Sequence, residues 1–201
     1  NISTGEGGML VAKAEEHVRQ AKLLRSHGMT TLSYERSKGH ATTYDVVDLG
    51  YNYRITDFQC ALGLSQLCKA EEFVQRRRTI AARYDAAFRE LRPVEPMAVD
   101  PDAYHAYHLY VVRFQPDAFS VDRGKIFEAL RAEGIGVNVH YIPAYYHPFY
   151  RELLGDQTGL CPVAEEAYEQ IISLPIFPAM ADSDIDDVVA AVEKIVEAWG
   201  T

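Results

Sequence analysis

The sequence GYNYRITDFQ at residues 50–59 decides how this chain folds, because a polar aromatic loop there runs directly into a helix that ends near Leu67. Thr56 and Gln59 have the spacing of a capping box, in which each side chain accepts the backbone amide of the other residue. The start of the helix is therefore fixed. Apolar residues within the helix recur at spacings of three and four, which predicts one face packed on a core. These residues are Phe58, Ala61, Leu62 and Cys68.

Asn52 and Arg54 bring an amide donor and a guanidinium to the loop that precedes this helix. A loop held rigidly at a helix N-terminus and carrying such donors is suited to phosphate or another anion. An ordinary turn, with Arg54 in an ion pair with Asp48 or Asp57, explains the same residues. The loop residues taken alone favour the ordinary turn.

The composition sets bounds on the fold and on the partners. With 201 residues, 48% of them hydrophobic, the chain can bury one sizeable core or two small ones. The formal net charge of -9 argues against a nucleic-acid partner. No stretch approaches the run of about 20 apolar residues that a membrane helix needs, so no membrane partner is expected.

Two further features concern the cell compartment and the extent of the chain. Cys60, Cys68 and Cys161 are an odd number without a CxxC pair, which predicts reduced, mostly buried thiols in a cytoplasmic protein. The opening residues, 1–4, carry no Met and no start signal for a helix or a strand, so we expect a piece of a longer protein.

The first half of the chain shows several expected elements. An apolar run at residues 9–12 predicts a buried strand, and residues 14–27 predict a helix with its charges matched to the dipole. Residues 29–48, which hold Lys38-Gly39-His40, predict a long ordered loop. A second long helix is expected at residues 69–91, with Arg76-Arg77-Arg78 largely on its solvated side.

Pro93, Pro96 and Pro101 mark the best domain boundary, which divides the chain into residues 1–92 and 93–201. The second part shows the pattern strand, helix, strand, followed by two helices. Their ranges are 107–114, 122–133, 137–142, 162–172 and 184–199, with Asp182 or Ser183 as the cap of the last helix.

Aromatic side chains crowd residues 140–150, and they include His140 and Tyr141. Rings with hydroxyl or imidazole edges suit a sugar or a nucleotide, but packing between the two parts of the chain explains them equally well. A zinc site built from His140, His147 and Cys161 lacks compact ligand spacing, so no metal is expected.

Several motifs, taken together and in order, resemble the DegT/DnrJ/EryC1/StrS family of sugar aminotransferases. They are ISTGEGG at 2–8, GYNYR at 50–54 with ALGLSQL at 61–67, AYHLY at 106–110, VHYIP at 139–143 and SLP at 173–175. The resemblance covers nearly the whole chain. It implies an α/β fold, namely the C-terminal part of a fold type I pyridoxal-phosphate aminotransferase. Residues 1–92 would end the large cofactor domain and carry an interdomain helix, and residues 93–201 would form the small α+β domain.

The activity implied by the resemblance is transfer of an amino group, usually from glutamate, to a keto group on a nucleotide-linked sugar. The implied cofactor is pyridoxal 5'-phosphate. The resemblance also implies a role in the synthesis of surface polysaccharides or glycosylated metabolites. The family's Schiff-base lysine precedes the stretch that matches Asn1. No catalytic residue is therefore expected within these 201 residues, and the chain alone is expected to be inactive.

The resemblance also implies site residues and a homodimer with active sites at its interface. Asn52 would reach the cofactor phosphate of the partner subunit, and Arg54 would approach the diphosphate of the nucleotide sugar. His140 and Tyr141 would lie near the sugar and orient it without transferring the proton.

Two alternatives stay open. Some relatives resemble sugar dehydratases, in which histidine replaces the lysine. The chain could instead be a noncatalytic module that binds a sugar nucleotide through His140, Tyr141 and the tyrosines that follow.

Overall fold

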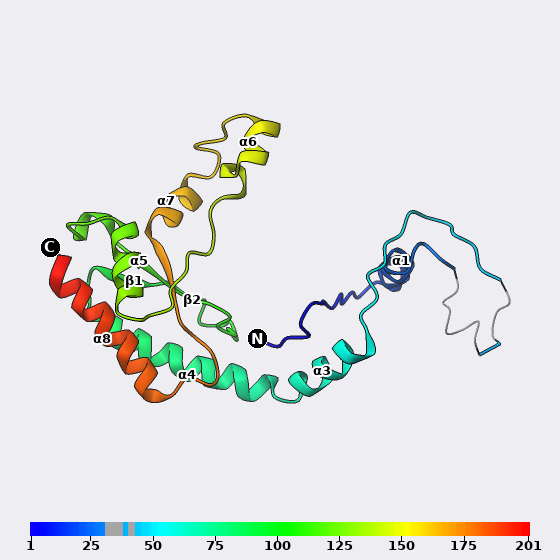
Figure 1. The fold of residues 1–201 in the computed structure, drawn as a ribbon, viewed down its shortest axis with the longest axis horizontal. Coiled ribbons are helices and arrows are strands. Elements are labelled where there is room, and N and C mark those ends of the chain that lie inside the picture. Colours follow the sequence, from blue (N-terminus) through cyan, green and yellow to red (C-terminus); the bar gives the residue numbers. More distant parts are fainter. Residues whose placement is uncertain (31–37, 40–42) are drawn as a thin grey trace. The chain divides into compact units, whose positions relative to one another are not determined.

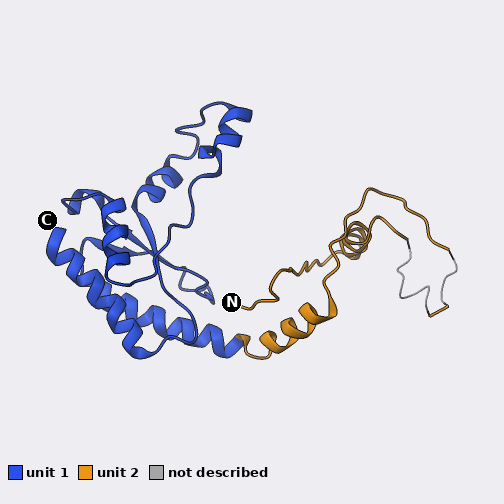
Figure 2. Cartoon of the chain, viewed as in Figure 1, with its two compact units in different colours: residues 1, 71–201 blue, residues 2–70 orange. Residues whose placement is uncertain are grey.

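The chain is described by a computed structural model over residues 1–30, 38–39 and 43–201. Two compact units are present: residues 2–70 form one, and residues 71–201 together with Asn1 form the other (Figure 2). These units follow from contacts within this chain alone, and the expected domains 1–92 and 93–201 stay a prediction. The loop expected at residues 29–48, including His40, lies in large part outside the described residues.

The unit of residues 2–70 contains two described helices, α1 (Glu15–Arg25) and α3 (Asp57–Leu67) (Figure 1). Acidic side chains in the first turn of α1 and basic ones in its last turn match the helix dipole, as predicted. The strand expected at residues 9–12 does not form, and Met9 and Val11 are 88% and 89% exposed. A strand needs a neighbour for its backbone donors and acceptors, and the described part of the chain places none beside it.

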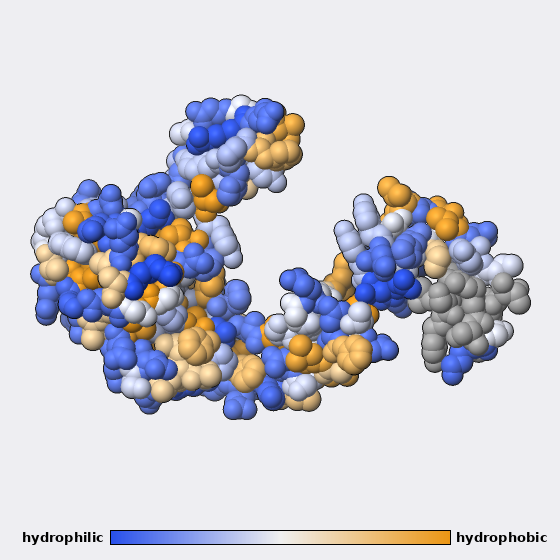
Figure 3. Space-filling model, in the orientation of Figure 1, coloured by the Kyte–Doolittle hydropathy of each residue, from blue (hydrophilic) through white to orange (hydrophobic). Residues whose placement is uncertain are grey.

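The prediction that α3 lays an apolar face on a core is wrong for this chain. No residue of α3 is buried, and Phe58 is 90% exposed. Figure 3 shows hydrophobic residues at the surface of this helix, among polar ones. The expected burial of the thiols is also wrong, since Cys60, Cys68 and Cys161 are free and exposed. The apolar pattern of α3 is real, but an apolar face is buried only when another element covers it.

The unit of residues 71–201 is built on a three-stranded antiparallel sheet in the order β1-β2-β3. The strands are β1 (Val94–Pro96), β2 (Tyr110–Phe114) and β3 (Ile171–Leu174). Alternate residues of β2 are buried, as its period of two predicts. The strand expected at 137–142 is wrong: only a single bridge, Asn138 to Ser173, joins that segment to β3.

Three helices, α4 (Ala70–Phe88), α5 (Arg123–Ala132) and α8 (Asp182–Trp199), share one hydrophobic core with this sheet. Tyr84, Ile126 and Val192 represent them in the core, each 1% exposed or less. The shorter helices are η1 (Pro116–Ala118), η2 (Ala144–Tyr146), α6 (Pro148–Leu154) and α7 (Pro162–Gln170). No helix in the described ranges is both long and apolar enough to cross a membrane.

Two helix ends differ from the prediction. Helix α8 begins at Asp182 and follows Ala181, whose amide donates to the Asp184 carboxylate at 2.8 Å. Neither Asp182 nor Ser183 is the cap. The predicted helix 162–172 ends at Gln170, because the next residues pair with β2 as strand β3.

The three consecutive arginines of α4, residues 76–78, do not form a solvated face. Arg77 is buried and donates to the backbone oxygens of Tyr107 at 2.9 Å and Ile176 at 2.8 Å. Arg76 donates to the Met180 oxygen, and Arg78 to the His105 oxygen. A run of charges alone predicts exposure, but a guanidinium on a long side chain can cross the helix surface to free carbonyls.

Candidate functional site

The loop of residues 50–55 is attached to the C-terminal end of α1 by backbone hydrogen bonds. The Tyr51 amide donates to the Leu24 oxygen at 2.7 Å, and the Tyr53 amide donates to the Arg25 oxygen at 2.9 Å. The Tyr51 oxygen accepts the His27 amide, also at 2.9 Å. Side chains of this loop are therefore carried by a stiff backbone.

Two glycines allow the loop to approach the α1 end closely. Gly28 has a φ of +66°, and a Cβ on it would lie 1.9 Å from the Asp48 oxygen. A Cβ on Gly50 would lie 2.0 Å from the Gly28 nitrogen. Both positions exclude any larger residue unless the backbone shifts.

The other end of the loop is fixed by the start of α3, and the predicted capping box is confirmed. The Thr56 amide donates to Gln59 Oε1 at 2.9 Å, and the Gln59 amide donates to Thr56 Oγ1 at 3.4 Å. Gln59 Nε2 also donates to the Glu6 oxygen at 2.7 Å. The loop is thus held at both ends within this unit.

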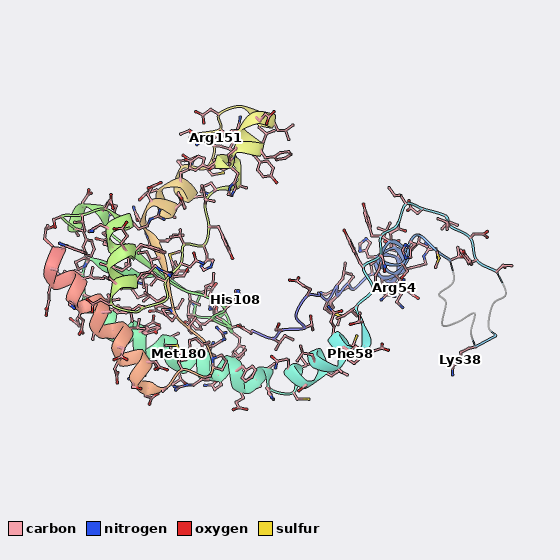
Figure 4. The ribbon with its side chains drawn as sticks, in the orientation of Figure 1. Lys38, Arg54, Phe58, His108, Arg151 and Met180 are labelled. Atoms are coloured by element: carbon pink, nitrogen blue, oxygen red, sulfur yellow. The ribbon has the colours of Figure 1, made fainter. Side chains whose placement is uncertain are left out.

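Asn52 and Arg54 lie together on this loop, where Arg54 Nε donates to Asn52 Oδ1 at 3.1 Å and both side chains are exposed. Arg54 is labelled in Figure 4. The ion pair of Arg54 with Asp48 or Asp57 is not present in the described ranges, and Asp48 instead accepts Gln20 Nε2. Arg54 engages the amide oxygen, and within the described ranges Asn52 Nδ2 donates to no acceptor. An exposed amide donor beside a guanidinium on a rigid loop fits a phosphate group.

In the other unit, His140 is held against β3. Its Nδ1 lies 2.8 Å from Ser173 Oγ, and its ring meets the Tyr141 ring edge-on at 4.6 Å. Tyr141 is 71% exposed. The Ser173 amide donates to the Asn138 oxygen at 2.7 Å, which keeps this segment beside the strand.

The segment 141–161, which we call the aromatic arm, carries η2 and α6 (Figure 1). Glu165 of α7 closes it, because its carboxylate accepts the Tyr145 hydroxyl at 2.8 Å and the Gly159 amide at 2.9 Å. Desolvation raises the pKa of Glu165, but hydrogen bonds, chiefly from Tyr145 and Gly159, outweigh it and lower the pKa below its ordinary value. The Tyr145 side chain therefore stabilises the arm through its hydrogen bond to Glu165. Arg151, labelled in Figure 4, lies over the ring of Tyr146.

Sequence reasoning missed Ser173 and Glu165 as residues that shape this region. Ser173 carried a signal, because it is a polar residue inside the apolar run of β3, whose four residues are all buried. Glu165 carried none, since an acidic residue in the first turn of a helix is explained by the helix dipole.

A profile of the DegT/DnrJ/EryC1/StrS aminotransferase family matches residues 1–193. This chain belongs to that family. It is 41% identical over 197 residues to an uncharacterized protein of Methanocaldococcus jannaschii, and 38% identical over 199 residues to the spore coat polysaccharide biosynthesis protein SpsC of Bacillus subtilis. The matches cover 98% of this chain and 51% of each relative, so the chain spans about half the length of the curated relatives it matches.

Solved structures of sugar aminotransferases share the fold. PseC of Helicobacter pylori, an aminotransferase involved in pseudoaminic acid biosynthesis, matches with a TM-score of 0.82 and 30% identity, over 94% of this chain and 48% of that one. The putative sugar aminotransferase Spr1654 of Streptococcus pneumoniae in its PMP form matches with a TM-score of 0.81 and 29% identity, over 95% and 47%. Spr1654 is also solved in its PLP form.

These matches confirm the expected fold class and the cofactor of the DegT/DnrJ/EryC1/StrS family. The α/β chain corresponds to about half of a pyridoxal-phosphate-dependent sugar aminotransferase. Pyridoxal 5'-phosphate is the cofactor with which the family works. The roles of Asn52, Arg54, His140 and Tyr141 stay predictions.

Proposed function

We propose that the whole protein containing these residues is a nucleotide-sugar aminotransferase, which moves an amino group from glutamate to a keto group on a nucleotide-linked sugar. The family match over residues 1–193 carries this proposal. The names of SpsC and PseC support a role in building polysaccharides or amino sugars. When bound, pyridoxal phosphate supplies the electron sink for the transfer.

Residues of this chain would bind and orient the reactants. Asn52 Nδ2 would donate to the cofactor phosphate of the partner subunit in a homodimer, because the amide oxygen is already engaged by Arg54. A neutral amide donates to phosphate without leaving a charge unpaired when the phosphate is absent. Arg54 would extend the same donor surface to the diphosphate of the nucleotide sugar.

His140 and Tyr141 would contact the sugar. The hydrogen bond to Ser173 holds the imidazole, and the exposed Tyr141 ring offers an apolar face and a hydroxyl. Both groups orient the sugar by hydrogen bonds and ring contact. The proton transfer belongs to the family's lysine.

We further propose that residues 1–201 alone have no transaminase activity, because none of their lysines matches the family's Schiff-base position. The active sites would lie at the homodimer interface. A cytoplasmic location agrees with three free cysteines in the described chain, since thiols persist in a reducing compartment.

The first test uses the full-length protein with pyridoxal phosphate. We expect an absorbance band of the bound cofactor that bleaches when glutamate is added, and a sugar substrate should restore it. No change with glutamate would contradict the aminotransferase. A band that resists glutamate while the sugar loses water would identify a dehydratase, and saturable binding of a sugar nucleotide without cofactor would identify a binding module.

The second test concerns Asn52. The variant Asn52→Ala should weaken cofactor affinity about tenfold, which is the effect of one lost charge-assisted hydrogen bond. Gln115→Ala is the control, because Gln115 is an exposed polar residue of the other unit. If the two variants bound the cofactor with equal affinity, Asn52 would not be a residue of the cofactor site.

A further inference from the structure

The contact between His140 and Ser173 joins an exposed segment to a buried strand. Ser173 is 4% exposed and lies in β3 between Ile172 and Leu174, which are 0% and 3% exposed. Its hydroxyl oxygen lies 2.8 Å from His140 Nδ1. The imidazole itself is half-buried, and Nε2 has no hydrogen-bond partner in the described ranges.

The surroundings of the serine decide which atom donates in this contact. A serine hydroxyl carries one proton to donate, and in the neutral imidazole one nitrogen carries a proton while the other accepts. His140 Nδ1 is the acceptor that the described chain offers to the Ser173 hydroxyl. If Nδ1 carried the proton, the hydroxyl proton would be buried without an acceptor, which costs free energy. The hydroxyl therefore donates to Nδ1.

The contacts around the pair keep this arrangement in place. The backbone bridge between Asn138 and Ser173 fixes the chain two residues before His140, with hydrogen bonds of 2.7 and 3.2 Å. The edge-on contact with Tyr141, at an interplanar angle of 80°, limits rotation of the imidazole. The hydroxyl of Ser173 and the imidazole of His140 thus meet in a defined geometry.

We propose that Ser173 is a positioning residue, which holds the proton of neutral His140 on Nε2 so that the imidazole presents an N–H donor to the substrate. The proposal rests on the proposed function, in which His140 faces the sugar nucleotide. It adds that the group recognised there is an oxygen acceptor, such as a sugar hydroxyl, a carbonyl or a phosphate oxygen. A ligand group that can only donate would leave the Nε2 proton unpaired.

A His140 imidazole that donates from Nε2 cannot also act as a general base. An imidazole whose Nδ1 is occupied by the serine proton and whose Nε2 carries a proton has no free lone pair to accept another. His140 in this state is a binding group and not a general base. The distinction is measurable without cofactor or substrate.

The first experiment reads the tautomer directly, by nitrogen NMR of protein labelled with ¹⁵N at histidine, at a pH where the imidazole is neutral. The chain has seven histidines, and the difference spectrum of His140→Gln assigns the signal. We expect Nδ1 of wild type to show the shift of an unprotonated ring nitrogen and Nε2 that of a protonated one. A proton on Nδ1 in wild type would overturn the proposal, whatever the variants do.

Variants then test whether the Ser173 hydroxyl sets the tautomer of His140. Ser173→Ala should convert His140 to a mixture of both tautomers, whereas Ser173→Thr, which keeps the hydroxyl, should retain the Nε2 proton. Ile172→Val is the matched control, because it removes a methylene from the residue before Ser173 in β3, and successive side chains of a strand point to opposite faces. An unchanged tautomer in a folded Ser173→Ala would overturn the proposal.

A kinetic experiment on the full-length enzyme connects the tautomer to the substrate. Ser173→Ala should raise KM for the sugar nucleotide about tenfold and leave the half-reaction with glutamate unchanged, because only orientation of one hydrogen bond is lost. An equal loss in both half-reactions would indicate a structural role and overturn the proposal. Failure of the enzyme to aminate any sugar would contradict the proposed function, and the NMR result would still decide the tautomer.

Discussion

Individual polar side chains tie the segments of the larger unit together, and Arg77 is the clearest case. It is buried in α4, and its Nη1 donates to the backbone oxygens of Tyr107, His108 and Ile176. Burial lowers the pKa of this guanidinium, and the three carbonyls compensate the charged form. One side chain therefore joins the helix to the segment before β2 and to the segment after β3.

The variant Arg77→Met should lower the free energy of unfolding by about 3 kcal/mol, because it leaves buried carbonyls without a donor. The adjacent Arg78→Met is the control and should cost less than about 1 kcal/mol, since its contacts are a carbonyl and the exposed ring of Tyr104. Urea unfolding of both variants measures the difference. Equal losses would show that the buried arginine does not carry this junction.

Among secondary-structure elements, the loop before α3 and the aromatic arm are held by different devices. Backbone hydrogen bonds and two glycines hold the loop against α1, so the position of Asn52 depends on close backbone approach. The arm depends instead on one carboxylate, Glu165, which accepts donors from both of its ends. The backbone hydrogen bonds that hold the loop are insensitive to pH, whereas the hydrogen bonds to the Glu165 carboxylate depend on its ionisation.

For the loop, Gly50→Ala should displace the backbone, because the new Cβ would overlap the Gly28 nitrogen. We expect a local loss of about 2 kcal/mol and faster hydrogen exchange at the Tyr51 and Tyr53 amides. Gly8→Ala is the control, since no atom lies within 4 Å of its added Cβ. Unchanged exchange at both amides in Gly50→Ala would contradict the close crossing.

For the arm, lowering the pH should release it. The folded pKa of Glu165 lies below its ordinary value of 4.5, so its stabilising effect is complete above that value and is lost as pH falls through the folded pKa. We expect the Gly159 amide to lose protection from exchange in that range. Glu165→Gln should remove the pH dependence, and a variant that keeps it would assign the effect to another carboxylate.

At the scale of the whole molecule, the two units differ in how they bury apolar residues. The larger unit has a core shared by the sheet and three helices, whereas α3 and residues 9–11 of the other unit expose theirs. Exposed apolar residues in such number favour association. The homodimer that we propose would offer a partner for them.

The 201-residue polypeptide should therefore associate with rising concentration, as measured by light scattering during gel filtration. The double variant Val11→Asp and Phe58→Ser should reduce the association, because both side chains are about nine-tenths exposed. Its melting temperature should stay within about 2 °C of wild type, since neither residue contributes to the core. Equal association of variant and wild type would contradict this origin.

Local signals predicted a large share of the fold. The capping box of Thr56 and Gln59, helices α1, α4 and α5, and strand β2 follow from periodicity and end residues, which act over a few positions. Strands β1 and β3 were missed, because both are short and acquire their pairing from β2. The segment 137–142 has the composition of a strand, yet only one of its residues pairs.

The sequence by itself determined the family, the pattern of helices and the residues that could face a cofactor or a sugar, because motif spacing and amphipathic periods are properties of the chain. Only the tertiary structure decided that Arg77 is buried, that α3 is exposed, and that Ser173 meets His140. These facts depend on which distant segment supplies a partner. A residue's own neighbours in sequence cannot specify that, since burial and hydrogen bonding are completed across the fold.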